Sequence, residues 1–580
     1  MSNYFKKIFF IIPKKLQSKI YFFLVINFLS ILFEMLGIVL IIPLVSLIFS
    51  LDIFYDYPIL SNVFNLLGKP SQEMMLVFLG FFIVIIFLIK NLVLLYFIWW
   101  QTNFAHNIQY LTSKSLFNIY LNKEYSFHLS NNSSKLIRNT GLESNNVRTA
   151  ILGLMTLITE IFLIIGIVSI LIFYNPVINS IVIITFVIFV SLFYFLTKNK
   201  ILEWGKIRLS QTAATIKGLN QAFQGIKDIK VFKRETYFLD FYTNNLNQLV
   251  KMNILNGFIK GIPKLFLEFL GIVVLICLLA ILFVNKIYSS EEIMTSLSLF
   301  AVSIIKILPS FSKVLASAQA IKYNYPSVDL VFQEFTNNKN YKNLNKSNKI
   351  EFLEKKDDNL FIIQDLNFKY NTKSSGLNKI NFRVKQNEII GIIGESGSGK
   401  STLINIILGL LKPDDGIIKF NGVEIKENLD SWRSKIGYIP QNIYLIDDSI
   451  KNNIAFGIND HEIDLNRVNE CIELAELNSL VNNLKDGINS IVGERGVKIS
   501  GGELQRIGIA RALYKNPNIL ILDEATSALD INTEKNILKT ILSLKKNRMI
   551  IVVSHRKSIF EFCKKIYEMN NGYVKLKSND

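Results

Sequence analysis

The sequence predicts two domains of different fold class: an all-α domain of six membrane-spanning helices, and an α/β domain after it. Three observations support this prediction. Half of the 580 residues are apolar, including 44 Phe, whereas soluble domains of this length have a more polar balance. Six long apolar stretches lie within the first 320 positions. From about residue 360 onward, short β-rich runs alternate with helical patterns, which is typical of an α/β fold.

The six apolar stretches are each long enough to cross a bilayer, since a spanning helix needs about 20 apolar residues. Lys and Arg are frequent near the N-terminus and in the two long loops that follow the second and fourth stretches, while the opposite loops carry acidic residues. The positive-inside rule therefore predicts that both termini are cytoplasmic. The first stretch is too long for a signal-peptide core and is expected to remain as a span. The expected spans are 21–49, 74–100, 151–174, 177–197, 262–284 and 293–320.

The same patterns give the expected domain boundaries: a membrane domain at 1–322, an Asn- and Lys-rich linker at 323–357 and the α/β domain at 358–580. The net charge of +18 fits cytoplasmic loops beside an anionic leaflet and, with six spans, does not predict nucleic-acid binding. The three cysteines are far apart in the sequence, so neither a disulfide framework nor a metal site is expected.

The long cytoplasmic loops lack turn clusters and are expected to extend the membrane helices. Short crossing helices are expected near their centres, at Leu142–Asn146 and Lys230–Glu235. In the first outer loop, Tyr57–Gly68 has apolar residues at helical spacing. A short surface helix and a packed loop are both consistent with that segment.

A glycine-rich loop follows the strand-like run Ile389–Ile393 and precedes an apolar helical pattern. Its spacing is that of a P-loop in the strand–loop–helix context that this motif requires. The glycines let backbone N–H groups approach phosphates, and the helix start adds a partial positive charge. We expect Lys400 to contact the β- and γ-phosphates of ATP, and the Ser401 hydroxyl to bind Mg²⁺. The predicted nucleotide-binding residues of this segment are Gly394, Glu395, Ser396, Gly397, Ser398, Gly399, Lys400, Ser401 and Thr402.

An acidic pair, Asp523 and Glu524, follows a second buried-type strand at 518–522. A carboxylate at the end of a strand beside a P-loop can reach the bound Mg²⁺, which is the role expected for Asp523. Glu524 would then lie where it can polarise the attacking water. The pair is a weak signal alone and a strong one together with the P-loop.

The run at 499–503 begins a helix and resembles the signature of the ATP-binding cassette family, with Ile and Glu where Leu and Gln are usual. The resemblance implies a type I exporter fold, because six spans precede the cassette in one chain. The block Val492–Gly496 also resembles an exporter segment. The residues that match the signature and would cap the nucleotide are Ser500, Gly501, Gly502 and Glu503.

Four further positions resemble functional residues of this family. By resemblance, Tyr370 stacks on adenine and Gln441 senses the γ-phosphate and binds Mg²⁺. Asp530 ends a run that resembles the loop joining two cassettes, and His555 resembles the switch histidine. In this family the signature of one cassette completes the P-loop site of another, so the resemblance implies a homodimer that hydrolyses ATP. It also implies a bacterial inner-membrane location.

Charged residues inside apolar spans are rare and are candidates for function. One interpretation is that glutamates and lysines pair within the membrane. Another is a water-filled cationic cavity formed by Lys90, Lys264 and Lys306. The second is supported by resemblance to the flippases of lipid-linked oligosaccharides, where arginines occupy these positions, and it implies an anionic glycolipid cargo. Export of a peptide, a lipid A-like lipid or a drug remains an alternative, as does an ATP-gated channel or regulator.

Overall fold

The protein is described by a computed structural model, in which contacts divide the chain into two units. The membrane unit comprises residues 1–123 and 130–342, and the cassette unit comprises 124–129 and 343–580. Each unit is described by itself. The residues that the structure describes are 2–39, 72–174, 176–285, 290–338, 360–370, 376–493, 496–524, 540, 548–554 and 562–577. The outer-loop segment Tyr57–Gly68 lies outside them.

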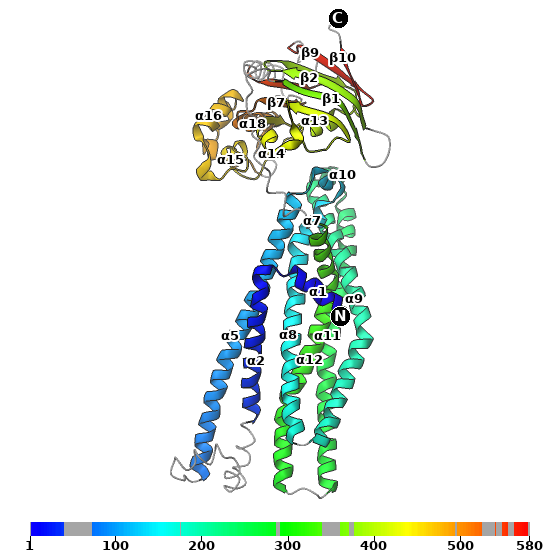
Figure 1. The fold of residues 1–580 in the computed structure, drawn as a ribbon, viewed down its shortest axis with the longest axis vertical. Helices are drawn as coiled ribbons and strands as arrows, with labels where there is room; N and C mark the ends of the chain where they lie inside the picture. The colour runs from blue at the N-terminus through cyan, green and yellow to red at the C-terminus, as the bar shows by residue number, and fades with distance from the viewer. Residues whose placement is uncertain are drawn as a thin grey trace. The chain divides into compact units, whose positions relative to one another are not determined.

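The described residues before position 339 form helices (Figure 1). Four of these helices have 48 to 51 residues, which corresponds to about 70–75 Å at 1.5 Å per residue. Because the hydrocarbon core is only about 30 Å thick, they extend well beyond it. The helices are α1 (Ser2–Ile11), α2 (Lys14–Val39), α5 (Gln72–Leu121), α6 (Tyr125–Ser130), α7 (Ser133–Arg138), the π-helix η2 (Asn139–Glu143), α8 (Ser144–Tyr174), α9 (Pro176–Gln224), α10 (Ile226–Phe232), α11 (Glu235–Asn285) and α12 (Ser290–Asn337).

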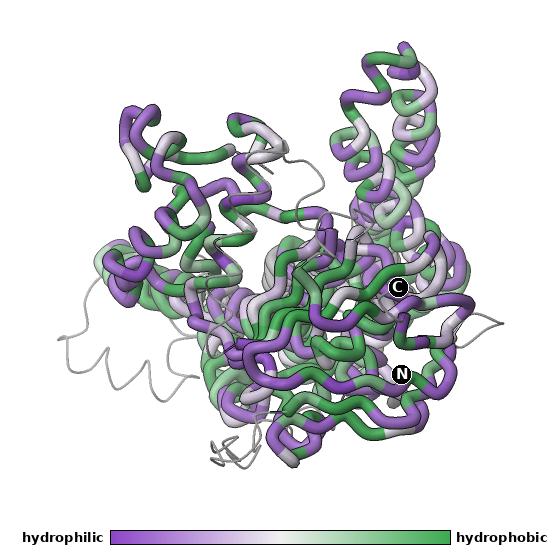
Figure 2. The backbone as a smooth tube through the Cα atoms, turned by 90° about the horizontal axis from the view of Figure 1, so that it is seen from above, coloured by the Kyte–Doolittle hydropathy of each residue, from purple (hydrophilic) through white to green (hydrophobic). Residues whose placement is uncertain are grey.

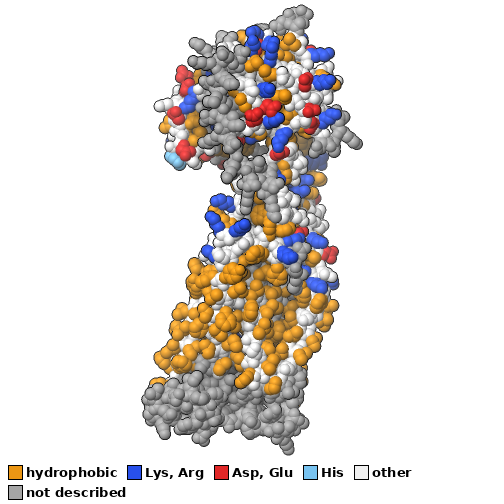
Figure 3. Space-filling view, in the orientation of Figure 1, with side chains coloured by type: hydrophobic (Ala, Val, Ile, Leu, Met, Phe, Trp, Pro, Cys, Tyr) orange, Lys and Arg blue, Asp and Glu red, His pale blue; other side chains and the backbone are white. Residues whose placement is uncertain are grey.

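The membrane unit contains the expected long apolar helices. Among the described residues, four segments are long and apolar enough to cross a membrane, within α2, α5, α7–α8 and α9. The remaining two expected spans, 262–284 and 293–320, lie within α11 and α12. Apolar side chains cover the visible face of these helices, and Lys and Arg gather at one end of them (Figure 3). This surface matches a lipid-facing belt with a basic margin.

Helix α12 is the centre of the packing, since it contacts α8, α9 and α11, while α2 packs on α5 and α8. Close approach between α9 and α12 depends on Gly205. A Cβ atom at that position would lie 2.3 Å from the carbonyl oxygen of Tyr323. Beyond this contact, the buried carboxylate of Glu143 in η2 lies 3.8 Å from Arg138 and 3.6 Å from Arg208, and it accepts a 2.6 Å hydrogen bond from Ser327 of α12. Glu143 thereby joins α7, α9 and α12.

The expected crossing helix at Leu142–Asn146 is wrong in position. That segment lies within η2 and the start of α8, and the chain turns earlier, around the short helix α6. The cause is a helix N-cap: the Asn132 side chain accepts a 2.8 Å hydrogen bond from the Ser134 backbone N–H and begins α7 there. The second segment, expected at Lys230–Glu235, overlaps α10, which ends at the left-handed residue Lys233.

The cassette unit contains two sheets (Figure 1). The first is antiparallel, in the order β2-β1-β4-β5, and the second is mostly parallel, in the order β10-β9-β3-β8-β7-β6. The strands are β1 (Leu360–Lys369), β2 (Gly376–Lys385), β3 (Ile389–Gly394), β4 (Asp415–Phe420), β5 (Val423–Glu424), β6 (Ile436–Ile439), β7 (Ile519–Asp523), β8 (Met549–Val553), β9 (Lys565–Asn570) and β10 (Tyr573–Lys577).

The parallel sheet is buried on both faces, as its continuous apolar strands require. Alternate residues of β7 enter different cores: Ile519 and Ile521 pack towards the antiparallel sheet, and Leu520 and Leu522 pack towards the helices on the other face. The apolar strands appear green between purple turns in Figure 2. The helices are α13 (Lys400–Ile407), α14 (Leu429–Ser434), α15 (Ile450–Ile454), α16 (Leu465–Leu474), α17 (Asn478–Asn483) and α18 (Gly501–Tyr514), with short 3₁₀ turns η4 (Ile425–Glu427), η5 (Asp460–Glu462) and η6 (Gly487–Asn489).

The first part of the segment predicted as a linker, 323–357, is helical in the structure. Helix α12 continues to Asn337, and the cassette strands begin at Leu360. Tyr323, Val328 and Val331 are buried, and this burial explains why a polar-looking segment stays helical. The all-α unit followed by an α/β unit confirms the predicted fold class.

Candidate nucleotide-binding site

The site is built at one edge of the parallel sheet. Strands β3, β8, β7 and β6 are neighbours and run parallel, so their carboxyl ends lie at the same edge. Ligands of open α/β sheets bind at this edge. The P-loop follows β3, the acidic pair ends β7, and Gln441 follows β6.

The P-loop folds around its glycines. Gly397 and Gly399 have φ of 83° and 106°, a region that side-chain-bearing residues rarely adopt. A Cβ atom at Gly399 would also lie 2.8 Å from a methyl carbon of Leu377. Gly399 is the N-cap of α13, so the first N–H groups of that helix point into the loop. The Lys400 ammonium donates to the carbonyls of Gly394 and Glu395 at 2.7 and 2.8 Å.

Two features of this loop fit a phosphate ligand. The hydroxyl of Ser398 is buried and has no hydrogen-bond partner among the described atoms, and a buried polar group of this kind is costly unless a ligand satisfies it. Burial lowers the pKa of Lys400, while the nearby Glu524 and Asp523 oppose that shift. The two carboxylates and the lysine therefore act on one another electrostatically. The remaining loop residues Glu395 and Ser396 are exposed.

Two side chains, one from the neighbouring strand β6 and one from the segment just after it, donate hydrogen bonds to the acidic pair. The Tyr438 hydroxyl donates to Asp523 at 3.3 Å, and the Gln441 amide donates to Glu524 at 2.6 Å. Burial raises the pKa of Asp523, and the bond from Tyr438 opposes that rise. The sequence assigned no role to Tyr438. Its signal was its position near the carboxyl end of β6, the strand that pairs with β7.

Tyr370 and Thr402 lie beside each other on the outer side of the loop. Their hydroxyl oxygens are 3.3 Å apart, and the Tyr370 ring is 43% exposed. The ring packs edge-on against Phe368, with centroids 4.9 Å apart. One aromatic face is thus supported by β1 while the residue stays accessible, which suits the stacking role expected for Tyr370.

The signature residues begin helix α18. Ser500 is its N-cap, and Ser500 and Glu503 form a capping box. The Ser500 backbone N–H donates to the Glu503 carboxylate at 2.7 Å, and the Glu503 N–H donates to the Ser500 hydroxyl at 3.3 Å. Gly501 and Gly502 form the first turn. The family usually has Gln at this position. A glutamate fits there because its side chain, like that of glutamine, can accept the hydrogen bond that completes the capping box. Asp530 and His555 lie outside the described residues, as do positions 494 and 495.

In the membrane unit, the structure brings together two of the three predicted lysines. Lys90 and Lys306 both contact Glu34, at 2.7 and 3.0 Å. Among the described residues, the carboxylate beside Lys264 is that of Glu268, 3.9 Å away on the same helix, and Lys264 is 70% exposed. Lys90 and Lys306 thus meet at Glu34 while Lys264 lies beside Glu268, and the cationic cavity of the three lysines stays a prediction. Pairing of glutamate with lysine, the other interpretation, is what these contacts display.

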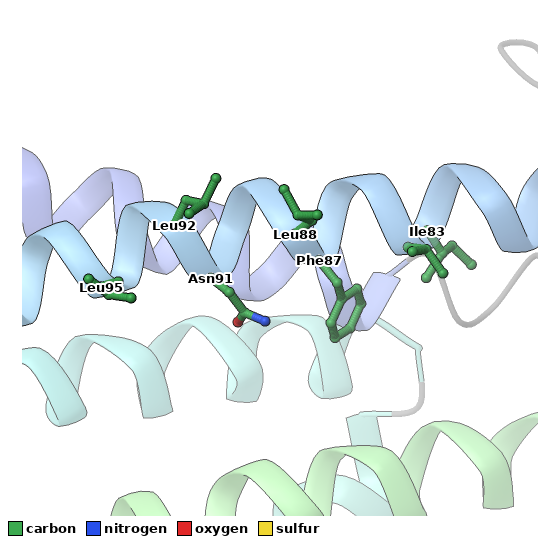
Figure 4. Close-up of a pocket in the computed structure, with 7 residues that line it drawn as sticks. Ile83, Phe87, Leu88, Asn91, Leu92 and Leu95 are labelled. Atoms are coloured by element: carbon green, nitrogen blue, oxygen red, sulfur yellow. The ribbon is translucent and has the colours of Figure 1, made fainter.

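A groove of about 600 Å³ lies along α5, next to this pair. In Figure 4, Phe87 and Asn91 point towards neighbouring helices, while Leu88 and Leu92 point away from them. The lining is apolar apart from Asn91. Phe87 connects the groove to the charged cluster, since its ring centroid is 4.4 Å from the Lys90 ammonium.

A bundle of long apolar helices joined to a P-loop cassette defines a membrane-embedded nucleotide-binding protein. The model of the ABC transporter transmembrane region matches residues 20–306, and the ABC transporter model matches residues 377–527. The chain belongs to the ABC transporter family and carries the transmembrane region and the ATPase domain in one polypeptide. The ATP-binding assignment of the cassette is thereby confirmed.

Comparison with individual proteins supports the same assignment. A putative export ATP-binding/permease protein of Rickettsia typhi is 40% identical over 36% of this chain and 37% of its own length. An ATP-dependent lipid A-core flippase of Ralstonia nicotianae is 38% identical over 36% of this chain and 37% of its own length. ABC transporter B family member 1 of Dictyostelium discoideum is 30% identical over 65% of this chain and 41% of its own length. The matches thus span less than half of each relative.

A solved structure of a bacterial Atm1-family ABC exporter with ATP bound has the same fold. Its TM-score is 0.73, with 96% of this chain and 94% of that chain covered. Sequence identity is 19%, so the likeness concerns the fold. It confirms the predicted exporter architecture, in which helices precede the α/β cassette.

Proposed function

We propose that this chain is one half of a homodimeric exporter that couples ATP hydrolysis to movement of an anionic amphipathic lipid. One observation carries the ATPase part: Lys400, Asp523, Glu524 and Gln441 gather at one sheet edge, where Gln441 donates to Glu524 and both carboxylates act on the charge of Lys400. The cassette, residues 358–580, would thus bind ATP, and the membrane domain that begins at residue 1 would carry the cargo.

Each residue has a role that its position supports. The N–H groups of the P-loop and the Lys400 ammonium bind the phosphates. Ser401, Gln441 and Asp523 supply oxygen ligands suited to Mg²⁺, which when bound neutralises phosphate charge. Glu524 accepts the proton of the attacking water on its carboxylate, and the bond from Gln441 fixes the orientation of that carboxylate. Tyr370 stacks on the base beside Thr402, while Asp530 and His555 remain proposed from the sequence.

The signature supports the dimer. The Ser500 hydroxyl is engaged with Glu503 of its own helix, and the start of α18 offers N–H groups of a helix N-terminus to an anion. In a homodimer, these residues of one chain would complete the ATP site of the other. Ser500, Gly501, Gly502 and Glu503 are accordingly proposed as nucleotide contacts from the second copy.

The variant Glu524→Gln tests the ATPase assignment. Glutamine can still accept the bond from Gln441 but cannot take a proton, so turnover is expected to fall about 100-fold or more, with ATP-bound dimers accumulating. Phosphate release and size-exclusion chromatography of the purified protein measure both effects. Brisk hydrolysis by this variant would refute the assignment of Glu524 as the base.

The proposed cargo is a lipid-linked oligosaccharide or a related anionic glycolipid in a bacterial inner membrane. The positive charge at mid-membrane depth supports an anionic headgroup, and the name of the lipid A-core flippase relative favours a lipid over a peptide. Proteoliposomes that contain a fluorescent isoprenyl-diphosphate glycan, a lipid A analogue or a labelled peptide distinguish these cargoes. ATPase stimulation with no movement of any of them would favour the channel or regulator instead. Reporter fusions at both ends test the proposed cytoplasmic termini.

A further inference from the structure

Glu34 is the centre of a three-residue ion cluster inside the membrane unit. Its Oε2 atom lies 2.7 Å from the ammonium of Lys90, and its Oε1 atom lies 3.0 Å from the ammonium of Lys306. The three residues come from α2, α5 and α12 and lie within three of the apolar spans. One carboxylate therefore joins three helices at membrane depth.

The charges of this cluster do not balance. Among the residues that the structure describes, two ammonium groups share one carboxylate, which leaves one positive charge in a region where an unpaired charge is costly. The side chains of Lys90 and Glu34 are only 4% and 13% exposed, whereas that of Lys306 is 35% exposed. Phe87 lies over the Lys90 ammonium at 4.4 Å and stabilises it only partly. The cluster can be reached from the side of Lys306.

A second ion pair in the same unit shows the balanced arrangement. In the described part of the chain, the ion-pair partner of Glu160 is Lys313, at 2.8 Å, and this lysine is 60% exposed. One carboxylate there meets one ammonium group, and no charge is left over. Within the apolar spans, the excess positive charge at Glu34 thus contrasts with the balanced pair at Glu160. Outside those spans, Glu143 is likewise shared by two cations, Arg138 and Arg208.

We propose that Glu34 is an internal counter-ion that occupies the anion site of the cargo and sets its selectivity. This inference rests on the proposed function, because it takes the cargo headgroup to be anionic. An incoming headgroup must displace the carboxylate from Lys306 and Lys90. A headgroup with a single negative charge only takes the place of the Glu34 carboxylate that it displaces, so one lysine charge stays uncompensated. A diphosphate carries more negative charge and neutralises both lysines. Glu34 is therefore a specificity-determining residue that favours diphosphates over monoanions.

The experiment measures binding of an isoprenyl diphosphate and of its monoanionic carboxylate analogue to the full chain in phosphatidylcholine nanodiscs. Glu34→Gln removes the competing charge, so diphosphate binding is expected to become about tenfold tighter or more, and the preference over the monoanion is expected to shrink. Glu160→Gln is the matched control and is expected to bind as the wild type does. Neutralising Lys90 and Lys306 together is expected to abolish diphosphate binding.

A pair of variants tests the charge argument even if Glu34→Gln folds poorly. Lys306→Gln leaves Glu34 and Lys90 as a neutral pair, so binding is expected to fall as far as in the double lysine variant. Adding Glu34→Gln to Lys306→Gln frees Lys90, and binding is expected to recover in part. Such non-additivity is the signature of residues that act through direct contact.

The outcomes separate this inference from the proposed function. In one outcome, diphosphate binding requires the two lysines and yet responds as expected neither to Glu34→Gln nor to Glu34→Gln combined with Lys306→Gln. That result refutes the counter-ion role of Glu34 and leaves the cationic site in place. If the wild type binds the diphosphate no better than the double lysine variant does, the anionic-cargo proposal itself is refuted, and the role of Glu34 with it.

Discussion

Glu524 combines an uncommon backbone conformation with a short side-chain contact. Its φ is 49°, in the left-handed region that non-glycine residues rarely occupy. Its backbone N–H donates to the Val553 carbonyl of the adjacent strand at 2.9 Å. Backbone strain of this kind persists only where the surroundings over-determine it, and it is concentrated at functional sites. The end of β7 thus presents the two carboxylates side by side, one held by Gln441 and the other by Tyr438.

The bond from Tyr438 to Asp523 predicts a pH effect. Burial raises the pKa of Asp523 and this bond lowers it, so Tyr438→Phe should raise the pKa of Asp523 further. Mg²⁺ needs the ionised carboxylate. The acidic limb of Mg²⁺-dependent ATPase activity is therefore expected to move to higher pH, by up to about one pH unit, as measured by phosphate release across a pH series.

The matched control for this prediction is Tyr444→Phe. Tyr444 follows β6 in the chain and is 61% exposed, so the activity profile of this variant should remain that of the wild type. An unchanged acidic limb in Tyr438→Phe would show that the hydroxyl does not influence Asp523.

Among the helices, the approach of α9 to α12 shows how a single position sets a packing distance. Gly205 has no side chain, and the carbonyl of Tyr323 occupies the space where a Cβ atom would stand. The Arg208 side chain, one turn further along α9, then reaches Ser327 at 2.7 Å. The buried polar contacts of Glu143 depend on the same approach.

Replacing Gly205 with Ala is expected to push α9 and α12 apart and destabilise the membrane unit by about 1–3 kcal/mol. Thermal unfolding of the detergent-solubilised protein measures this as a lower Tm. Gly257→Ala is the matched control, because nothing lies within 4 Å of its Cβ position and alanine favours the helix. Equal Tm values for the two variants would contradict the packing argument.

For the whole molecule, each chain carries one P-loop and one signature, so two shared sites need two chains. In a symmetric dimer each residue occurs twice, so a variant carried by both chains removes one element of each site, whereas a variant carried by one chain removes one element of one site. The Atm1-family exporter fold is compatible with such a pair, and the dimer can be tested by mixing variants.

Chains that carry Lys400→Ala and chains that carry Gly501→Asp are each expected to be inactive as homodimers. Co-reconstitution should restore one complete site in each mixed dimer, which combines the intact P-loop of one chain with the intact signature of the other. About a quarter of wild-type ATPase activity is expected for random pairing of independent sites. Activity no higher than that of either variant alone would argue against shared sites.

Much of this protein could be predicted from local sequence. The P-loop, the acidic pair and the apolar spans are contiguous patterns whose chemistry depends on short spacing, so the fold class and the cassette residues followed from them. The start of α7 was also encoded locally, by Asn132, but polar helical periodicity in the loop obscured it. The departure at Glu503 became intelligible only once its bonds to Ser500 were seen.

The sequence by itself determined which residues are apolar enough to span a membrane and which loop cradles phosphates, because both depend on neighbours along the chain. Only the tertiary structure decided that Tyr438 holds Asp523, that α12 stays helical to Asn337 and that Lys90 and Lys306 share Glu34. The physical reason is that ion pairing and burial depend on which helix faces meet, and these faces come from segments up to 272 residues apart.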